Sequence, residues 1–319
     1  MTLQGITGLR VATNLGRLGD LWGVDVDPAV YRDRPKKPSN QLTLLEVEAF
    51  DWVSRQADLG VPVVRTAGPR IRVGDLEGLR RELNTEYRIA VSTVLALDAG
   101  WLGLKHIDAL EQELKAADRD VALVFAAAFN PLDGKRRIEA LRRLLSWARD
   151  AGRRLELLRT DLAGLPAVME GAAVAAIGLS TSGRHLGTPM GARQGKAYDQ
   201  RKRSPLVFVP RLLHWQRANV LGELAPWNGA GVTHCDCPHC ADHRHDLQRF
   251  DTAQEQVGTQ VREHDELALS TVIREIMSAE DPRNELKFRR TNAVQRGKSI
   301  GASLDVRLDP PPAWLDAWD

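Results

Sequence analysis

The chain of 319 residues is 43% hydrophobic and 27% charged, with a formal net charge of +2. These values are ordinary for a soluble globular protein, and the length suits one large domain with a small appendage. The small net charge excludes a chain that is basic throughout, so any binding of nucleic acid has to come from local patches. No apolar run approaches a membrane span, and the N-terminus lacks the core of a signal peptide. We therefore expect a cytoplasmic protein with no membrane partner.

The first 40 residues alternate short apolar pieces with Gly and Asp, and Pro35 and Pro38 interrupt any helix at their end. They are expected to hold a first strand or to cover the main domain. From Thr43 the apolar positions fit a helix. Thr43 is a candidate N-cap, and Glu46 three residues later completes a capping box.

Six short apolar runs follow, and most are separated by helical patterns. Near-continuous apolar runs are typical of parallel strands that are covered on both faces, and this rhythm is that of βα units. A doubly wound open sheet has the same rhythm, but no Gly-rich dinucleotide motif or P-loop follows any run. We therefore predict an α/β protein of the (β/α)8 TIM-barrel type, with two further strands, one or both of them in residues 1–40. The six runs are residues 61–66, 88–97, 121–129, 153–159, 172–180 and 205–213.

In such a barrel the active site lies on the loops after the strand C-termini. Two acids stand there, Asp98 after the second run and Asp161 after the fourth. Either could act as a nucleophile or as a general acid or base. The alternative for each is an N-cap of the helix that follows. Asn130, Arg184 and His185 are further polar residues just past strand runs.

Basic residues cluster in two places where they could contact phosphates without reading sequence. The alternative is a solvated surface run, as is expected for the basic helix at 135–143. The first cluster lies in the polar stretch ahead of the cysteines, and the second follows the helix beyond them. The candidate nucleic-acid-binding residues are Lys196, Arg201, Lys202, Arg203, Arg289 and Arg290.

All three cysteines lie together as C-x-C-x-x-C at Cys235, Cys237 and Cys240. Three thiolates and one imidazole make a closed structural zinc site, and such a cluster suits a reducing cytoplasm better than a disulfide scaffold. His264 is the best fourth ligand because the segment around it reads as a helix that can lie back on the loop. His243 or His245 could instead close the site locally.

This pattern resembles the zinc subdomain of the tRNA-guanine transglycosylase family. The step Glu263-His264-Asp265 is similar to that family's Glu-His-Asn step, and its histidine ligand would fall on His264. The resemblance implies a (β/α)8 barrel, a structural Zn²⁺ and exchange of guanine for a 7-deazaguanine base in tRNA or, in some relatives, in DNA. It also implies that the zinc subdomain helps to dock the nucleic acid. The Tyr198-Asp199 pair is the nearest counterpart of the family's Phe-Asp nucleophile, whereas the family's Asp-Ser-Gly-Gly step is absent.

The expected organisation is a barrel over residues 1–230, a zinc-binding subdomain over 231–300 and a tail over 301–319. The tail could pack on the barrel or on another subunit, as in a homo- or heterodimer. The first functional hypothesis is base exchange, with Asp98, Asp161 and Asp199 as candidate catalytic acids. The second is a non-catalytic family member that serves as a scaffold or nucleic-acid docking subunit. A barrel hydrolase with catalytic zinc ranks last, because a closed site leaves no open coordination position.

Overall fold

The structure is a computed structural model, and its contacts divide the chain into two compact units. Unit 1 comprises Met1–Leu132 and Arg136–Thr188, and unit 2 comprises Asp133–Lys135 and Pro189–Asp319. Unit 2 thus contains the predicted zinc-binding segment together with about forty residues that were predicted to belong to the barrel. Among the described residues, no helix is long and apolar enough to cross a membrane. The described residues are 2–4, 25–27, 52–127, 130–132, 134–179, 181–187, 204–224, 231–252, 257–303, 312 and 314–318.

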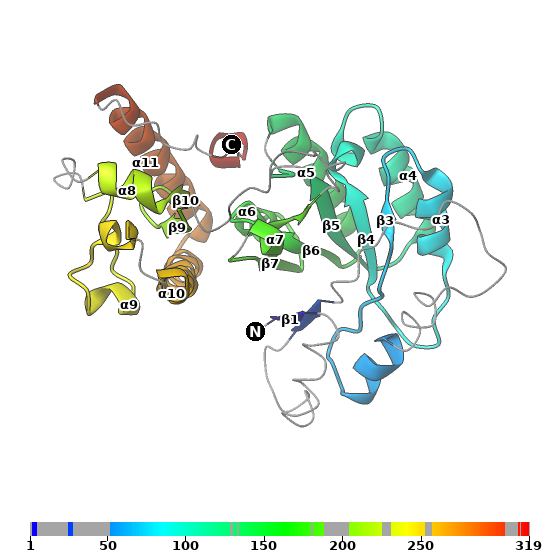
Figure 1. Ribbon diagram of the computed structural model, residues 1–319. Helices are drawn as coiled ribbons and strands as arrows, with labels where there is room; N and C mark the ends of the chain where they lie inside the picture. The colour runs from blue at the N-terminus through cyan, green and yellow to red at the C-terminus, as the bar shows by residue number, and fades with distance from the viewer. Residues whose placement is uncertain are drawn as a thin grey trace, which may run out of the picture. The chain divides into compact units, whose positions relative to one another are not determined.

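Unit 1 is built on a parallel sheet of five strands that follow one another in chain order (Figure 1). The central strands are buried because both of their faces are covered: in the second strand Val94, Leu95, Ala96 and Leu97 are all 0% exposed. A doubly wound sheet reverses its strand order at a switch point, and this sheet has no reversal among its five strands. The strands are β3 (Arg70–Ile71), β4 (Thr93–Asp98), β5 (Val121–Ala127), β6 (Leu155–Thr160) and β7 (Val174–Ile177).

Helices connect these strands where the apolar periodicity predicts them. The amide of Gly78 donates to the Asp75 side chain at 2.9 Å and so caps the first of them. In the longest, apolar positions three and four residues apart, such as Ile138, Leu141 and Leu145, are 0% exposed. The helices are α3 (Leu76–Asn84), η2 (Ala99–Leu102), α4 (Ile107–Ala117), α5 (Lys135–Asp150) and α6 (Gly164–Met169).

The α/β class is confirmed, whereas closure of an eight-stranded barrel is not shown by the described strands. Two short strands do lie within residues 1–40, β1 (Thr2–Gln4) and β2 (Asp25–Asp27), and they pair with each other in parallel. The predicted capping pair Thr43 and Glu46 lies outside the described residues, while residues 52–58 are helical.

Two of the six predicted strands take a different form. The run at 61–66 contributes only an isolated parallel bridge, Arg65 with Ser92, and the edge strand β3 comes later. The run at 205–213 was predicted as a parallel strand, and this is wrong. Its strand β9 (Leu206–Val209) pairs antiparallel with β10 (His214–Arg217) in unit 2.

The carboxyl edge of the sheet contains an inserted segment. The β5–β6 pairing ends at Leu123 and Leu157, after which β6 carries a bulge and Arg159 adopts a φ of 53°. The end of β5 then pairs with β8 (Leu186–Gly187), which follows the short helix α7 (Thr181–Arg184). Bulges and left-handed residues often lie beside functional sites. Here they bring a later segment to the strand ends.

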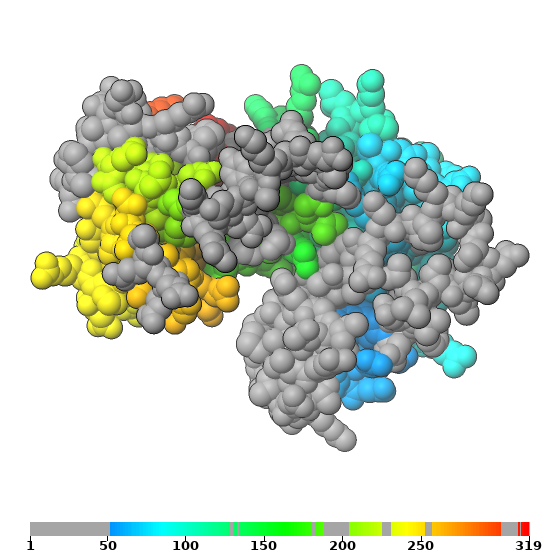
Figure 2. Space-filling model, in the orientation of Figure 1, coloured from blue at the N-terminus to red at the C-terminus, as the bar shows by residue number. Residues whose placement is uncertain are grey.

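Unit 2 packs a β-hairpin and several helices around the cysteine loop. Helix α10 lies against β9 and α9, and α11 packs along α10. Figure 2 shows the segments of α9 and α10, in yellow and orange, side by side on the face turned to the viewer. The tail ends in a short helix that is buried on α11. The helices are α8 (Ala218–Glu223), α9 (Pro238–Ala241), η5 (Leu247–Phe250), α10 (Val257–Met277), α11 (Pro282–Ser303) and α12 (Trp314–Ala317).

Candidate functional site

The cysteine loop is a tight turn whose backbone places three thiols on one side. Cys237 is the N-cap of α9 and Pro238 its first residue, a position where the missing proline N–H costs nothing. The Cys240 amide donates to the Cys237 carbonyl at 2.9 Å, and the Cys237 amide donates to Cys235 Sγ at 3.4 Å. The segment that returns from the loop is held by the Cys235 amide, which donates to the His245 carbonyl at 2.8 Å. Local backbone bonds therefore fix the spacing of the sulfurs.

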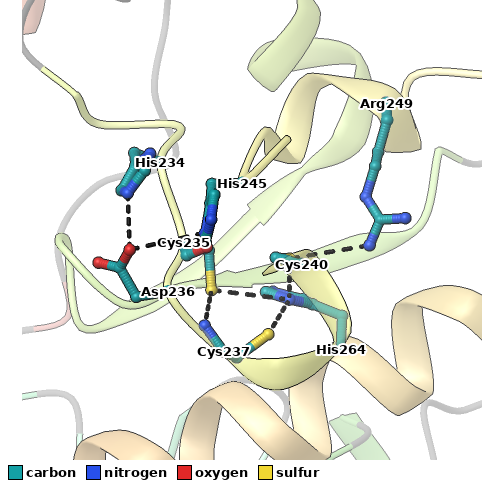
Figure 3. A network of polar contacts seen from close by, with 8 residues as sticks. All are labelled: His234, Cys235, Asp236, Cys237, Cys240, His245, Arg249 and His264. Carbon is teal, nitrogen blue, oxygen red and sulfur yellow. Dashed lines mark hydrogen bonds and ion pairs between the residues drawn. The ribbon is translucent and has the colours of Figure 1, made fainter. Parts of the chain in front are cut away.

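His264 on α10 faces all three sulfurs (Figure 3). Its Nδ1 lies 4.0 Å from Cys235 Sγ, 3.5 Å from Cys237 Sγ and 3.3 Å from Cys240 Sγ. A tetrahedral zinc with ordinary bond lengths holds sulfur and nitrogen ligands about 3.6 Å apart. The four side chains are at most 2% exposed. The donor set and its spacing are compatible with a closed zinc site.

The other side of the His264 ring is anchored to the hairpin. Its Nε2 lies 2.8 Å from the Phe208 carbonyl oxygen, which can only accept, so Nε2 carries a proton and Nδ1 is the nitrogen left to bind a metal ion. The neighbouring Asp265 accepts from the Phe208 amide at 2.7 Å and from Trp215 Nε1 at 2.9 Å. The Glu-His-Asp step thus binds α10 both to the cysteines and to β9.

An arginine side chain lies against one of the cysteine sulfurs. Arg249 Nη2 donates to Cys240 Sγ at 3.7 Å, and its guanidinium stacks over the Phe250 ring at 4.4 Å. Phe250 in turn packs against His264, with ring centroids 5.3 Å apart. Three thiolates and one divalent cation carry a net negative charge, so a positive neighbour stabilises the loaded site. The sequence offered no signal for this role, because it depends on the packing of η5.

Proton sharing within the site is strong. The Cys237 thiolate accepts from Cys235 and Cys240, which lowers the pKa of Cys237 and raises that of Cys235. Burial alone would lower the pKa of His264, but contacts to the Cys237 and Cys240 sulfurs outweigh it and raise the pKa to about 10. A metal ion requires thiolates and neutral imidazole, so its binding releases these protons.

The alternative histidine ligands lie elsewhere. His243 is exposed, and His245 contacts the Cys235 carbonyl through Nδ1 at 3.0 Å rather than a sulfur. Of the basic residues after the loop, Arg289 is paired with Glu275 and Glu285. Arg290 is 5% exposed and donates to the Leu315 carbonyl at 2.8 Å. As placed, Arg290 holds the C-terminal helix on α11 rather than facing a phosphate.

Asp98 ends β4 and is held by an arginine from the neighbouring strand. Arg70 Nε donates to its Oδ1 at 2.6 Å, and Arg70 Nη2 contacts the same oxygen at 2.5 Å. The Asp98 side chain makes no cap bond to the η2 helix and remains 20% exposed. Helix α4 begins later, with His106 as its N-cap. Capping therefore does not account for Asp98.

Asp161 lies beyond β6 in a polar cluster that the inserted segment completes. Its Oδ1 accepts from the Ala163 amide at 2.8 Å, and its Oδ2 accepts from the Asn130 side chain. Burial raises the pKa of Asp161, and the hydrogen bonds and the charge of Arg184 oppose the rise. Burial also lowers the pKa of His185, which follows Arg184 in the chain. The bond from the Ala163 amide lies in the turn ahead of α6, whose N-cap is Ala163 itself, so the N-cap role predicted for Asp161 is not observed. Its burial distinguishes Asp161 from Asp98.

The remaining predicted site residues lie outside the described part of the chain. They are Asp199, Lys196, Arg201, Lys202 and Arg203. Comparison of the chain with models of protein families, with curated proteins and with solved structures found no match.

Proposed function

We propose that this chain is a transglycosylase-like protein that exchanges guanine for a 7-deazaguanine base in tRNA or DNA. The observation that carries the proposal is the Cys3His cluster, in which His264 of the Glu-His-Asp step meets the C-x-C-x-x-C loop. A consecutive parallel sheet in the other unit supports a (β/α)8 barrel as the catalytic part. Zinc is the ion that this donor set prefers, and its role is structural.

Base exchange requires one carboxylate to form a bond with the ribose C1′ while the bond from C1′ to the base nitrogen breaks. The departing base takes up a proton, and the incoming base loses one when it displaces the carboxylate. Asp161 is suited to carry that proton, because burial raises its pKa above the ordinary value of a carboxyl group. Asp98, in an ion pair with Arg70, and Asp199 are the candidates for the nucleophile.

The alternative is a docking or scaffold subunit that keeps the zinc site but not the chemistry. Two observations favour it: Asp161 is only 8% exposed, and Asp98 is bound by Arg70. A carboxylate that protein groups already satisfy is poorly placed to attack a sugar. The two functions differ in whether purified protein incorporates labelled base.

The deciding experiment measures incorporation of labelled guanine and 7-deazaguanines into tRNA and duplex DNA by the wild type and by Asp→Asn variants at 98, 161 and 199. The nucleophile variant should lose all activity and any trapped covalent adduct. The general acid variant should lose about two to four decades of rate. Asp150→Asn, at the exposed end of α5, is the matched control and should retain full activity. Wild-type protein without incorporation into either substrate supports the docking function.

Docking itself has a separate test. Reversing Arg201, Lys202 and Arg203 to Glu should weaken nucleic-acid binding equally across sequences and flatten its salt dependence, because phosphate contacts release counterions. The matched control reverses three exposed cations of unit 1 and should leave both quantities unchanged. These are Arg88, Lys105 and Arg136. Filter binding over a salt series measures both, and an unchanged slope in the first variant contradicts the proposal.

A further inference from the structure

A second cluster of metal-binding side chains lies beside the cysteines. His234, Asp236 and His245 each offer one donor atom, and the three atoms lie within 4.8 Å of one another. Two imidazoles and one carboxylate favour a divalent transition ion such as zinc, cobalt or nickel, whereas magnesium and calcium prefer oxygen ligands throughout. The cluster contains no sulfur, so it is chemically distinct from the Cys3His centre.

The backbone of the cysteine loop holds these side chains in place. His234 and Asp246 form an antiparallel bridge, which sets His234 and His245 next to each other on adjoining segments. Their rings stack with centroids 5.0 Å apart and planes inclined by 25°. His245 is reached through two successive left-handed residues, with φ values of 59° at Arg244 and 60° at His245. Such a conformation is unfavourable outside glycine and persists only where the surroundings fix it.

The donor atoms lie close to one another, and the nearest pair stands at hydrogen-bond distance. His234 Nε2 lies 2.7 Å from Asp236 Oδ1, and His245 Nδ1 lies 3.6 Å from the same oxygen. Nitrogen and oxygen ligands of one tetrahedral ion stand about 3.3 Å apart. The Cys235 carbonyl oxygen lies 3.0 Å from His245 Nδ1 and can only accept, so this ring donates from Nδ1 and offers Nε2 to an ion. An ion would replace the proton that His234 and Asp236 otherwise share.

The cluster is open where the cysteine site is closed. His234 and His245 are each 37% exposed and Asp236 is 70% exposed, against at most 2% for the four buried ligands. His234 and Asp236 also line a cleft of about 260 Å³ within unit 2, together with Arg211 and Arg296. An ion held there is accessible from solvent and keeps coordination positions for an exchangeable ligand.

We propose that His234, Asp236 and His245 form a second, exchangeable site for a divalent transition-metal ion in unit 2. The site is separate from the structural centre and does not depend on the proposed base exchange. Its ion coordinates through imidazole nitrogens and carboxylate oxygen and presents open positions to the arginine-lined cleft.

The test is metal stoichiometry on the full chain, without a histidine tag and with its thiols reduced. After equilibrium dialysis against excess Zn²⁺, elemental analysis should give two ions per wild-type chain and one for the His234→Ala, His245→Ala double variant. Asp236→Asn should keep the first ion and weaken the second at least about tenfold. His243→Ala, which changes an exposed histidine of the same loop, is the matched control and should keep two.

Co²⁺ distinguishes the two sites by spectroscopy, because only the cysteine site gives a thiolate-to-metal charge-transfer band. The wild type should show this band with the first equivalent and only weak ligand-field absorption with the second. Retention of the band in the double variant shows that the loop is still folded. The proposal is overturned if the wild type binds a single ion, if the double variant binds two, or if His243→Ala loses the second.

Discussion

Each unit encloses a fully buried polar cluster, and the two clusters are satisfied in opposite ways. In unit 1 the Arg65 guanidinium reaches Glu156 at 2.6 Å, with the two side chains 1% and 0% exposed, and Arg154 donates to the other carboxylate oxygen. In unit 2 three sulfurs converge on the one imidazole of His264. Opposite charges complete a structural ion pair by themselves. Converging donors of the same kind indicate an ion as their common partner.

The two units should also differ in what their stability depends on. Unit 1 should not depend on a metal ion, because its buried Arg65 and Glu156 neutralise each other. Unit 2 should depend on the metal concentration, because a ligand that binds only the folded state adds its binding free energy to folding. Four changes test this contrast between the units.

Cys237→Ser should remove the structural ion and unfold unit 2. The free energy of metal binding at such sites is on the order of 10 kcal/mol, which is comparable to the whole stability of a typical domain. Zinc content should fall, and amide hydrogen exchange in α10 should become fast while that in β4 stays slow. His243→Ala, on the same loop, should change neither measurement. Slow amide exchange in α10 of the Cys237→Ser variant would show that unit 2 does not need the metal ion to stay folded.

Glu156→Gln should destabilise unit 1 by about 3–5 kcal/mol, because it leaves Arg65 buried without a compensating charge. Urea denaturation followed by hydrogen exchange in β5 measures the loss, and zinc content should not change. The control is Glu113→Gln, whose partner Arg80 is 56% exposed. Breaking that surface pair should cost less than about 1 kcal/mol. Equal effects of the two variants would contradict the assignment of the buried pair.

Arg249→Gln should weaken zinc binding about 10- to 100-fold without unfolding the loop, as is typical when a partner of a metal ligand is lost. The cause is loss of the charge that faces the Cys240 sulfur. Competition with a chromophoric chelator measures the change. Arg262→Gln, which alters an exposed cation of α10, should leave the affinity unchanged. A similar loss in both variants would point to the net charge of the unit instead.

Asp161→Asn should have the smallest effect on stability, and the effect should depend on pH. Burial raises the folded pKa above its ordinary value of 3.8, so the stabilising contribution is complete below pH 3.8 and is lost as pH rises through the folded pKa. The variant does not titrate at this position. Between pH 4 and 7 it should therefore gain stability relative to the wild type, by about 1.4 kcal/mol for each pH unit that separates the folded pKa from the ordinary one. Urea midpoints at the two pH values measure the gain, and Asp150→Asn should show none.

Several features of the molecule could be predicted from the sequence because short-range geometry determines them. The C-x-C-x-x-C spacing closes a turn on its own, and the period of α10 places His264 on its buried face. Helices α3, α4 and α5 follow their apolar periodicity, and the strands β4 to β6 follow their continuous apolar runs. In each case the signal lies within one turn or one strand.

Other features were decided only by the tertiary structure. The apolar run that forms β9 suits a parallel sheet or a hairpin equally well, and only the alignment of its hydrogen-bonding groups with β10 selects the hairpin. The same holds for Arg290, whose burial under α12 depends on the folding back of the tail. Asp98 and Asp161 occupy equivalent strand ends, yet Arg70 binds one and Asn130 the other. Residues far apart in the chain supply these partners. The period of a helix can be predicted from neighbouring residues, whereas the environment of such a side chain cannot.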